Sequence, residues 1–194
     1  MFRKLLSFIT KGRKKRFLQK NSPQMVYGYH SADGFLQDTR IGSTTSLVNK
    51  SNLLIEDNVF IGQYNFIEAS NGIIIREGCQ ITNYISIISH SSHNSIRYYG
   101  KRYRQEKNLK GYVKGQVEIG KYSFIGPHST ILPGTKIGKG CIVSAYSLLK
   151  GDYPDFSIVS GNPAVVVGNT KTKDEDFFKS NPELKKFYEE WVNE

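Results

Sequence analysis

The side chains best suited to chemistry in this 194-residue chain gather in one polar stretch, residues 89–94, which reads Ser-His-Ser-Ser-His-Asn. It holds His90 and His93, two of the four histidines. A histidine can remove a hydroxyl proton near neutral pH, because its pKa lies close to that range. The alternative for either residue is an ordinary core or surface histidine.

A histidine that acts as a base usually needs a second group to fix its tautomer. Glu68 lies 22 residues before His90 and interrupts the otherwise neutral stretch 65–70. We expect Glu68 to orient or polarise His90. A solvated carboxylate at a corner of the chain is the competing interpretation.

The segment that follows, residues 95–116, mixes cations with tyrosines. Tyrosine rings can stack on sugar faces, and cations can bind carboxylates or phosphates. We therefore expect an acceptor site for an anionic saccharide or a nucleotide-sugar. The alternatives are a solubilising loop and, ranked lower, a single-stranded nucleic-acid site. The candidate substrate-binding residues are His93, Arg97, Tyr98, Tyr99 and Arg102, with Lys101, Arg104 and Tyr103 beside them.

A six-residue repeat surrounds these residues and must position them. An aliphatic residue returns at positions 119, 125, 131, 137, 143 and 149, and earlier at 55, 61 and 67, then at 75, 81 and 87. This period does not fit a helix of 3.6 residues per turn but fits three short strands per coil, stacked as a prism. The aliphatic residues point inward, the following glycines tolerate unusual backbone angles at corners, and Cys79 and Cys141 are small core residues.

The repeat stops after Ile87 and resumes near Val117, so residues 90–116 form a loop inserted at a corner. Such loops usually build the binding face of a repeat protein. The two histidines of interest lie where this loop leaves the coil.

The repeats resemble those of the hexapeptide-repeat acyltransferases over roughly residues 41–168, including the ending Ser-Gly-Asn-Pro-Ala at 160–164. The resemblance implies an all-β, left-handed parallel β-helix with a protruding loop and short terminal helices. It also implies an acetyl-CoA-dependent acyltransferase with His90 as general base and no metal. The stretch 89–100 is similar to capsule-biosynthesis members, which implies O-acetylation of a sugar in surface polysaccharide synthesis.

The resemblance further implies a homotrimer with acetyl-CoA bound between subunits. The sequence departs from the family pattern at two positions: Pro127 has no N–H to offer the thioester carbonyl, and Val165 stands where relatives often have Lys or Arg. Lys171 or Lys173 is then expected to meet the 3′-phosphate. The residues implied to contact acetyl-CoA are Phe124, Gly126, Ser144, Ala145, Lys150 and Lys171.

Three other functions stay open. Amino-sugar or nucleotide-sugar N-acetyltransferases use similar prisms. A zinc-dependent hydration enzyme would need His90, His93 and His128 to converge, although their spacing does not match that family. A non-catalytic scaffold would only display its loop and basic arm.

The net charge of +10 is local. Residues 1–20 hold eight Lys/Arg and no acid, residues 91–116 carry a net +6, and the remainder is 10 − 8 − 6 = −4. This distribution argues against a general nucleic-acid-binding protein. Two cysteines, no apolar run of about 18 residues and no signal-peptide core predict a cytoplasmic protein.

Both ends are expected to carry helices. Residues 2–9 read as a short amphipathic basic helix, which predicts either peripheral contact with the inner face of a membrane or a solvated or subunit-packed arm. Residues 1–40 would form this arm and a cap, and residues 169–194 a tail. Its helix at about 182–192 would cover the prism with Trp191.

Overall fold

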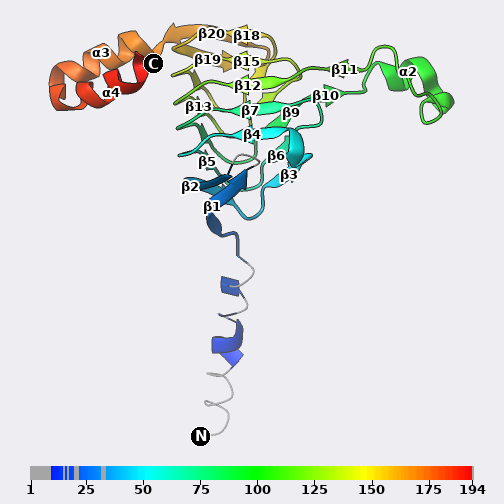
Figure 1. Ribbon diagram of the computed structural model, residues 1–194, viewed down its shortest axis with the longest axis horizontal. Coiled ribbons are helices and arrows are strands. Elements are labelled where there is room, and N and C mark those ends of the chain that lie inside the picture. Colours follow the sequence, from blue (N-terminus) through cyan, green and yellow to red (C-terminus); the bar gives the residue numbers. More distant parts are fainter. Residues whose placement is uncertain (1–9, 15, 17, 20–21, 32–33, 194) are drawn as a thin grey trace, which may run out of the picture.

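The computed structural model is a triangular prism with three appendages (Figure 1). It describes residues 10–14, 16, 18–19, 22–31 and 34–193. The N-terminal segment leads away from one end of the prism, a loop projects to one side, and a helical pair lies at the other end.

Three sheets form the faces of the prism. Sheet A has the order β1 (Met25–Ser31), β2 (Gly34–Gly42), β5 (Phe60–Ile61), β8 (Gln80–Ile81), β13 (Phe124–Ile125), β16 (Ile142–Val143), β19 (Ser157–Gly161), β20 (Ala164–Asn169). Sheet B has the order β17 (Leu148–Leu149), β14 (Thr130–Ile131), β9 (Ser86–Ile88), β6 (Phe66–Glu68), β3 (Ser46–Val48). Sheet C has the order β18 (Asp152–Tyr153), β15 (Lys136–Ile137), β12 (Val117–Ile119), β7 (Ile73–Ile75), β4 (Leu53–Ile55). We call the corners between them the A–B, B–C and C–A edges.

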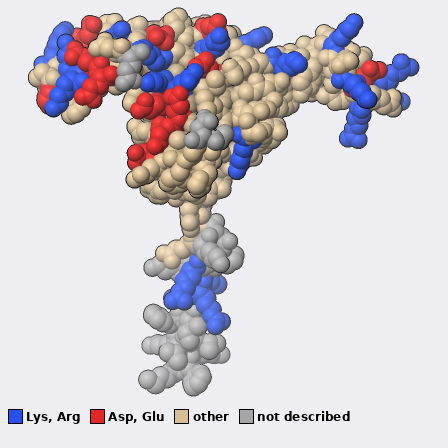
Figure 2. Space-filling model, in the orientation of Figure 1, with Lys and Arg blue, Asp and Glu red and all other residues tan. Residues whose placement is uncertain are grey.

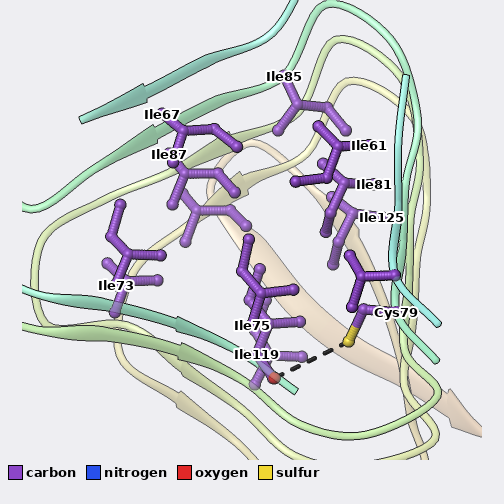
Figure 3. Packing of buried hydrophobic residues seen from close by; sticks show 14 of the residues in the cluster. Ile61, Ile67, Ile73, Ile75, Cys79, Ile81, Ile85, Ile87, Ile119 and Ile125 are labelled. Carbon is purple, nitrogen blue, oxygen red and sulfur yellow. Dashed lines mark hydrogen bonds between the residues drawn. The ribbon is translucent and has the colours of Figure 1, made fainter. Parts of the chain in front are cut away.

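The repeated aliphatic residues form the core. The coils pair in parallel with a step of twenty residues, as in Ile61↔Ile81, and later of eighteen, as in Ile125↔Val143. The inward residues are almost completely buried and stack in columns from coil to coil (Figure 3). Each coil thus covers the apolar face of its neighbour. The predicted fold class is confirmed.

The glycine that follows the aliphatic residue has a different role from the predicted one. Its φ is not positive; the left-handed conformation falls two residues later, at Tyr64 and His128 among others. A Cβ on Gly62 would lie 2.7 Å from the carbonyl oxygen of Thr82, and one on Gly126 would lie 2.6 Å from the amide nitrogen of Ala145. The close approach of successive coils therefore requires glycine here.

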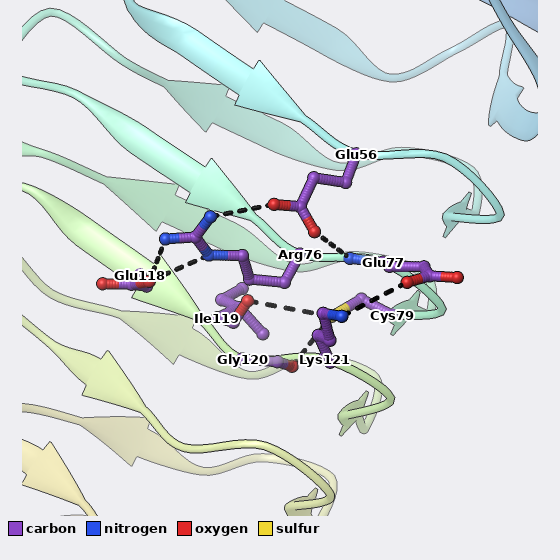
Figure 4. A network of polar contacts seen from close by, with 8 residues as sticks. All are labelled: Glu56, Arg76, Glu77, Cys79, Glu118, Ile119, Gly120 and Lys121. Atoms are coloured by element: carbon purple, nitrogen blue, oxygen red, sulfur yellow. Dashed lines mark hydrogen bonds and ion pairs between the residues drawn. The ribbon is translucent and has the colours of Figure 1, made fainter. Parts of the chain in front are cut away.

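The C–A edge is held by charge pairs and by the C-terminal helix. The Arg76 guanidinium lies 2.8 Å from both Glu56 and Glu118, which belong to the coils on either side (Figure 4). Cys79 is buried beneath this network, and burial raises the pKa of its thiol to about 12. Cys141 is buried as well, so both cysteines are core residues as predicted.

Antiparallel hairpins close both ends of sheet A, where β1 pairs with β2 and β19 pairs with β20. Sheet A already includes residues 34–42, so the cap merges with the first coil. Besides the predicted C-terminal helix, found as η3 (Pro182–Leu184) and α4 (Lys185–Val192), the tail forms a helix that the sequence did not predict, α3 (Thr170–Ser180).

The Trp191 ring of α4 lies 4.7 Å from the Tyr122 ring, centroid to centroid, so this helix covers the C–A edge. The proposed amphipathic helix at 2–9 lies outside the described residues. Within the described part of the chain, no helix is both long and apolar enough to cross a membrane.

Candidate active site

The corners at the B–C edge differ in their number of residues, and the longer corners form the site. The step from Ile67 to Ile75 is eight residues instead of six, and the same corner one coil earlier, with η1 (Lys50–Asn52), is equally long. One coil later, this corner carries the whole inserted loop. At its base, β10 (His90–Ser91) pairs antiparallel with β11 (Val113–Lys114). We call residues 90–116 the arm; it also contains α2 (Ser95–Tyr99) and η2 (Gly100–Arg102).

His90 and Glu68 meet at this edge. The Nδ1 atom of His90 lies 2.6 Å from Oε2 of Glu68. Glu68 ends β6, and His90 lies just beyond the end of β9, the neighbouring strand in sheet B, so coil stacking brings them together. The Glu68 side chain is 7% exposed and that of His90 32% exposed. The carboxylate is therefore enclosed while the imidazole reaches solvent.

The Glu68 carboxylate is held by donors from three successive coils. Its Oε1 accepts hydrogen bonds from the Ser70 amide (2.9 Å) and from Nδ2 of Asn49 (3.0 Å), and Oε2 accepts one from the Ser89 hydroxyl (3.2 Å). Burial raises the pKa of Glu68, but hydrogen bonds from Ser70 and Asn49 and the charge of His90 outweigh it and lower this pKa to about 2. Glu68 is therefore an anion at neutral pH.

This geometry favours one tautomer of His90. An ionised carboxylate only accepts hydrogen bonds, so the Nδ1 atom beside it carries the proton. The Nε2 atom then has a free lone pair that can receive a proton from a hydroxyl. The His90 ring also stacks on Tyr112 of the arm, with centroids 5.4 Å apart and an interplanar angle of 10°. The ring is thus fixed at both its edge and its face.

The sequence did not indicate three residues that lie near His90. The Ser70 hydroxyl lies 2.9 Å from Nδ1 of His90, Asn49 holds Glu68, and Tyr112 stacks on the imidazole. The lengthened corners at 49–52 and 69–72 carried the only sequence signal for the first two. Tyr112 reaches His90 because the arm folds back as an antiparallel ladder, which the repeat does not encode.

Most candidate acceptor residues lie farther along the arm. The Nδ1 atom of His93 is 2.8 Å from the Ser91 hydroxyl, and Arg97 bonds the His93 carbonyl and the Asn94 side chain. The Tyr99 hydroxyl donates to the Asn108 carbonyl and accepts from the Lys110 amide, so it ties the arm together. The side chains of Tyr98 and Arg102 are exposed.

The residues implied to contact acetyl-CoA lie mainly on other edges. Gly126, Ser144 and Ala145 form A–B corners, and Phe124 on β13 is 40% exposed beside them. Lys150 follows β17 at a B–C corner, two coils beyond the corner of His90. Within one chain, the base and most of this set are therefore on different edges.

Three further residues named in the sequence analysis are Lys171, Pro127 and His128. The first two concern the contacts with acetyl-CoA, and His128 concerns the zinc-dependent alternative. Lys171 is the second residue of α3, and its Nζ lies 4.2 Å from the centroid of the Phe156 ring. Pro127 also lies at an A–B corner, beside His128. The His128 ring stacks between Tyr84 (4.9 Å) and Tyr146 (4.7 Å) on that edge, whereas His90 lies on the B–C edge. The three histidines of the zinc alternative therefore do not converge within one chain.

Replacing the enclosed carboxylate should change the pH dependence of stability. The folded-state pKa of Glu68 (about 2) is below its ordinary 4.5, so its stabilisation is present above about pH 4.5 and is lost as the pH falls toward 2. We expect Glu68→Gln to lower the free energy of unfolding at pH 7 by an amount on the order of 2 to 3 kcal/mol. The deficit should shrink between pH 4.5 and pH 3. Urea unfolding at pH 7, 5 and 3 measures it.

The exposed Glu106 of the arm is the matched control. Its replacement, Glu106→Gln, should leave the unfolding free energy unchanged within about 0.5 kcal/mol at all three pH values. A Glu68→Gln deficit that stays constant with pH would contradict the assignment of an ionised, hydrogen-bonded carboxylate.

Comparison with known proteins agrees with the repeat analysis. The family model described as "Bacterial transferase hexapeptide (six repeats)" matches residues 115–151, and that described as "Hexapeptide repeat of succinyl-transferase" matches residues 53–87. The chain is 38% identical over 93 residues to a putative acetyltransferase, YvoF, of Bacillus subtilis, covering 48% of this chain and 54% of YvoF. It is 25% identical over 129 residues to the putative lipopolysaccharide biosynthesis O-acetyl transferase WbbJ of Escherichia coli, covering 66% and 65%. The chain thus matches less than two thirds of the length of these relatives.

Solved structures share the fold. AntD, an N-acyltransferase from Bacillus cereus solved with dTDP and 3-hydroxybutyryl-CoA, superposes with a TM-score of 0.57 at 19% identity, over 75% of this chain and 89% of AntD. A maltose O-acetyltransferase from Clostridium difficile superposes with a TM-score of 0.53 at 20% identity, over 64% of both chains. The repeats, both family-model matches and the parallel prism therefore agree with the resemblance of this chain to the hexapeptide-repeat acyltransferases.

Proposed function

We propose that this protein transfers an acetyl group from acetyl-CoA to a sugar hydroxyl during surface polysaccharide or capsule synthesis. The observation that carries the proposal is the buried Glu68 carboxylate, 2.6 Å from Nδ1 of a solvent-accessible His90. Support for the acceptor class comes from the similarity to WbbJ, which is named as a lipopolysaccharide O-acetyl transferase, and from the capsule-like sequence at 89–100.

The reaction uses the free Nε2 of His90. This atom takes the proton of the acceptor hydroxyl as the hydroxyl oxygen attacks the thioester carbonyl carbon. The carbon–sulfur bond then breaks, the sulfur of CoA leaves, and the proton on Nε2 passes to it. Glu68 stabilises the transient imidazolium and keeps Nε2 facing the acceptor, so it acts as a positioning residue. The proton that leaves the acceptor hydroxyl thus ends on the CoA sulfur, and the step needs no metal.

The location of the donor site argues for an assembly. His90 lies on the B–C edge, whereas Phe124, Gly126, Ser144 and Ala145 lie along the A–B edge. If the B–C edge of one prism faces the A–B edge of the next, the two sets meet. Such a head-to-tail contact closes into a ring, and a trimer is the ring we propose. In this arrangement each arm reaches over a neighbouring subunit.

The alternative is N-acylation of an amino sugar carried on a nucleotide. The observation in its favour is the fold shared with AntD, an N-acyltransferase solved with dTDP, along 89% of AntD. An amine acceptor would use the same base, since His90 would take the proton from the attacking nitrogen.

Thiol release tests the proposal. Purified protein is given acetyl-CoA and, in separate reactions, neutral saccharides, acidic saccharides and amino sugars. We expect saccharide-dependent thiol release and an acetylated product by mass spectrometry. Release with amino sugars alone would select the N-acyl alternative, and a protein that does not bind acetyl-CoA would contradict an acyltransferase altogether.

A further inference from the structure

The arm forms an open cavity of about 590 Å³, and one of its lining residues is Tyr112, whose ring stacks on His90. The lining residues all come from the returning half of the arm: Tyr103, Lys107, Asn108, Leu109, Lys110, Tyr112 and Lys114. Of the acceptor residues named from the sequence, Tyr103 alone is among them. The cavity is therefore a feature of the folded arm.

The cavity and the proposed base share one face of a small sheet. His90 pairs directly with Lys114 across the β10–β11 ladder. Directly opposed residues in an antiparallel pair have side chains on the same side, and so does the residue two positions along, Tyr112. The stacking of Tyr112 on His90 agrees with this register. Lys114 and Tyr112 thus line the cavity and flank the base.

The lining of the cavity is positively charged. Its lining contains the exposed lysines 107, 110 and 114 and no carboxylate. Among the described residues, none of these three ammonium groups forms an ion pair with a carboxylate. Lys and Arg also gather on the projecting arm in Figure 2. Like charges placed close together without partners repel each other, so a bound anion would stabilise them.

We propose that the acceptor is an anionic saccharide whose carboxylate or phosphate binds Lys110 and Lys114 in this cavity, with its sugar ring against Tyr112 or Tyr103. This proposal rests on the proposed acyl transfer and names its acceptor class. Tyr112 stacks on His90 and Lys114 pairs with it across the ladder, so an anion held by this cavity would bring a neighbouring hydroxyl of the same saccharide toward Nε2. The phosphates of CoA are the competing anion for this cavity, and acetyl-CoA binding by the lysine variants distinguishes the two.

Binding of defined probes to the full chain tests the proposal. The probes are trigalacturonate, galactose 1-phosphate and neutral galactotriose, measured by calorimetry at low and at physiological ionic strength. We expect at least one anionic probe to bind about tenfold or more tightly than galactotriose, since a charge-assisted hydrogen bond is worth about 1.5 kcal/mol or more. The comparison of trigalacturonate with galactose 1-phosphate shows whether a carboxylate or a phosphate is preferred. Equal affinity for all three probes, or no binding, would overturn the proposal.

Matched variants locate the anion. Lys110→Met and Lys114→Met should each weaken the anionic probe about tenfold and leave galactotriose unchanged, whereas Lys114→Arg should retain binding. Lys101→Met removes the same charge from an exposed position of the arm outside the cavity. If it weakens the anionic probe as much as the cavity variants do, only the diffuse charge of the arm matters and the proposal is wrong. Equal melting temperatures check that the variants fold.

Acetyl-CoA binding separates this proposal from the proposed function. If wild-type protein binds acetyl-CoA but does not discriminate anionic from neutral saccharides, the acceptor class is wrong and the acyl transfer stands. If it discriminates the saccharides but does not bind acetyl-CoA, the acyl transfer fails. If Lys110→Met and Lys114→Met weaken acetyl-CoA instead of the saccharide, the cavity is a CoA phosphate site and the proposal is overturned.

Discussion

His90→Ala should lower kcat/KM for the acceptor by about 10²- to 10⁴-fold, the usual contribution of a positioned general base. The loss should fall on kcat, because the proton transfer occurs in the transition state, and KM for acetyl-CoA should be nearly unchanged. Steady-state thiol release with a saccharide acceptor that the wild-type protein acetylates measures both constants. The His90 side chain is about one third exposed, so its truncation leaves no core cavity, and the fold should be retained.

His93→Ala is the matched control, since it removes a second histidine from the same stretch. His93 is exposed, and the side-chain contact found for its ring is to the Ser91 hydroxyl. Its loss should raise KM for the acceptor by less than tenfold and leave kcat nearly unchanged. If His93→Ala abolishes turnover while His90→Ala does not, the assignment of the base is reversed.

Ile137→Ala should destabilise the prism by about 2 to 5 kcal/mol, as large-to-small substitutions in a packed core do. The Ile137 side chain is 2% exposed and stacks between Ile119 and Tyr153 in the column of sheet C. Each coil is stabilised mainly by its neighbours, so a cavity here weakens the contacts of three coils. Urea unfolding at neutral pH, followed by circular dichroism, measures the change.

Lys136→Ala tests the same strand on its outward face. Lys136 precedes Ile137 in β15, and its side chain is exposed. Its replacement should change the free energy of unfolding by no more than about 0.5 kcal/mol. Similar losses for the two variants would contradict the inward stacking of the repeat.

The six-residue repeat is sufficient to predict the prism. Ile61, Ile81 and Ile125 recur at hexad positions, and each is buried in one column of sheet A. Residues spaced in this way are forced inward because parallel strands of successive coils pair in register, and a slip by one residue would expose the whole column. The insertion at 90–116 is equally visible in the sequence, since it interrupts the period.

Local patterns were less informative about how the coils fit together. The glycine after each aliphatic residue suggested an unusual φ, but the need for glycine at Gly62 arises from the coil above it. The helix α3 was missed because its apolar residues are few and form no clear stripe. The requirement at Gly62 thus depends on a neighbour that is distant in the sequence.

The candidate site, too, was predicted from the sequence only in part. The sequence pointed to His90 and Glu68, because one interrupts the repeat and the other is a charge in a neutral stretch about one coil earlier. Their contact, however, is made by coil stacking, and the lengthened corner that brings Ser70 to 2.9 Å from His90 is a property of the stacked edge. Only the folded arm decided that Lys110 and Lys114, rather than Arg97 and Arg102, line the cavity beside the base. An antiparallel ladder sets which residues face each other by its register, and the arm's composition does not encode that register.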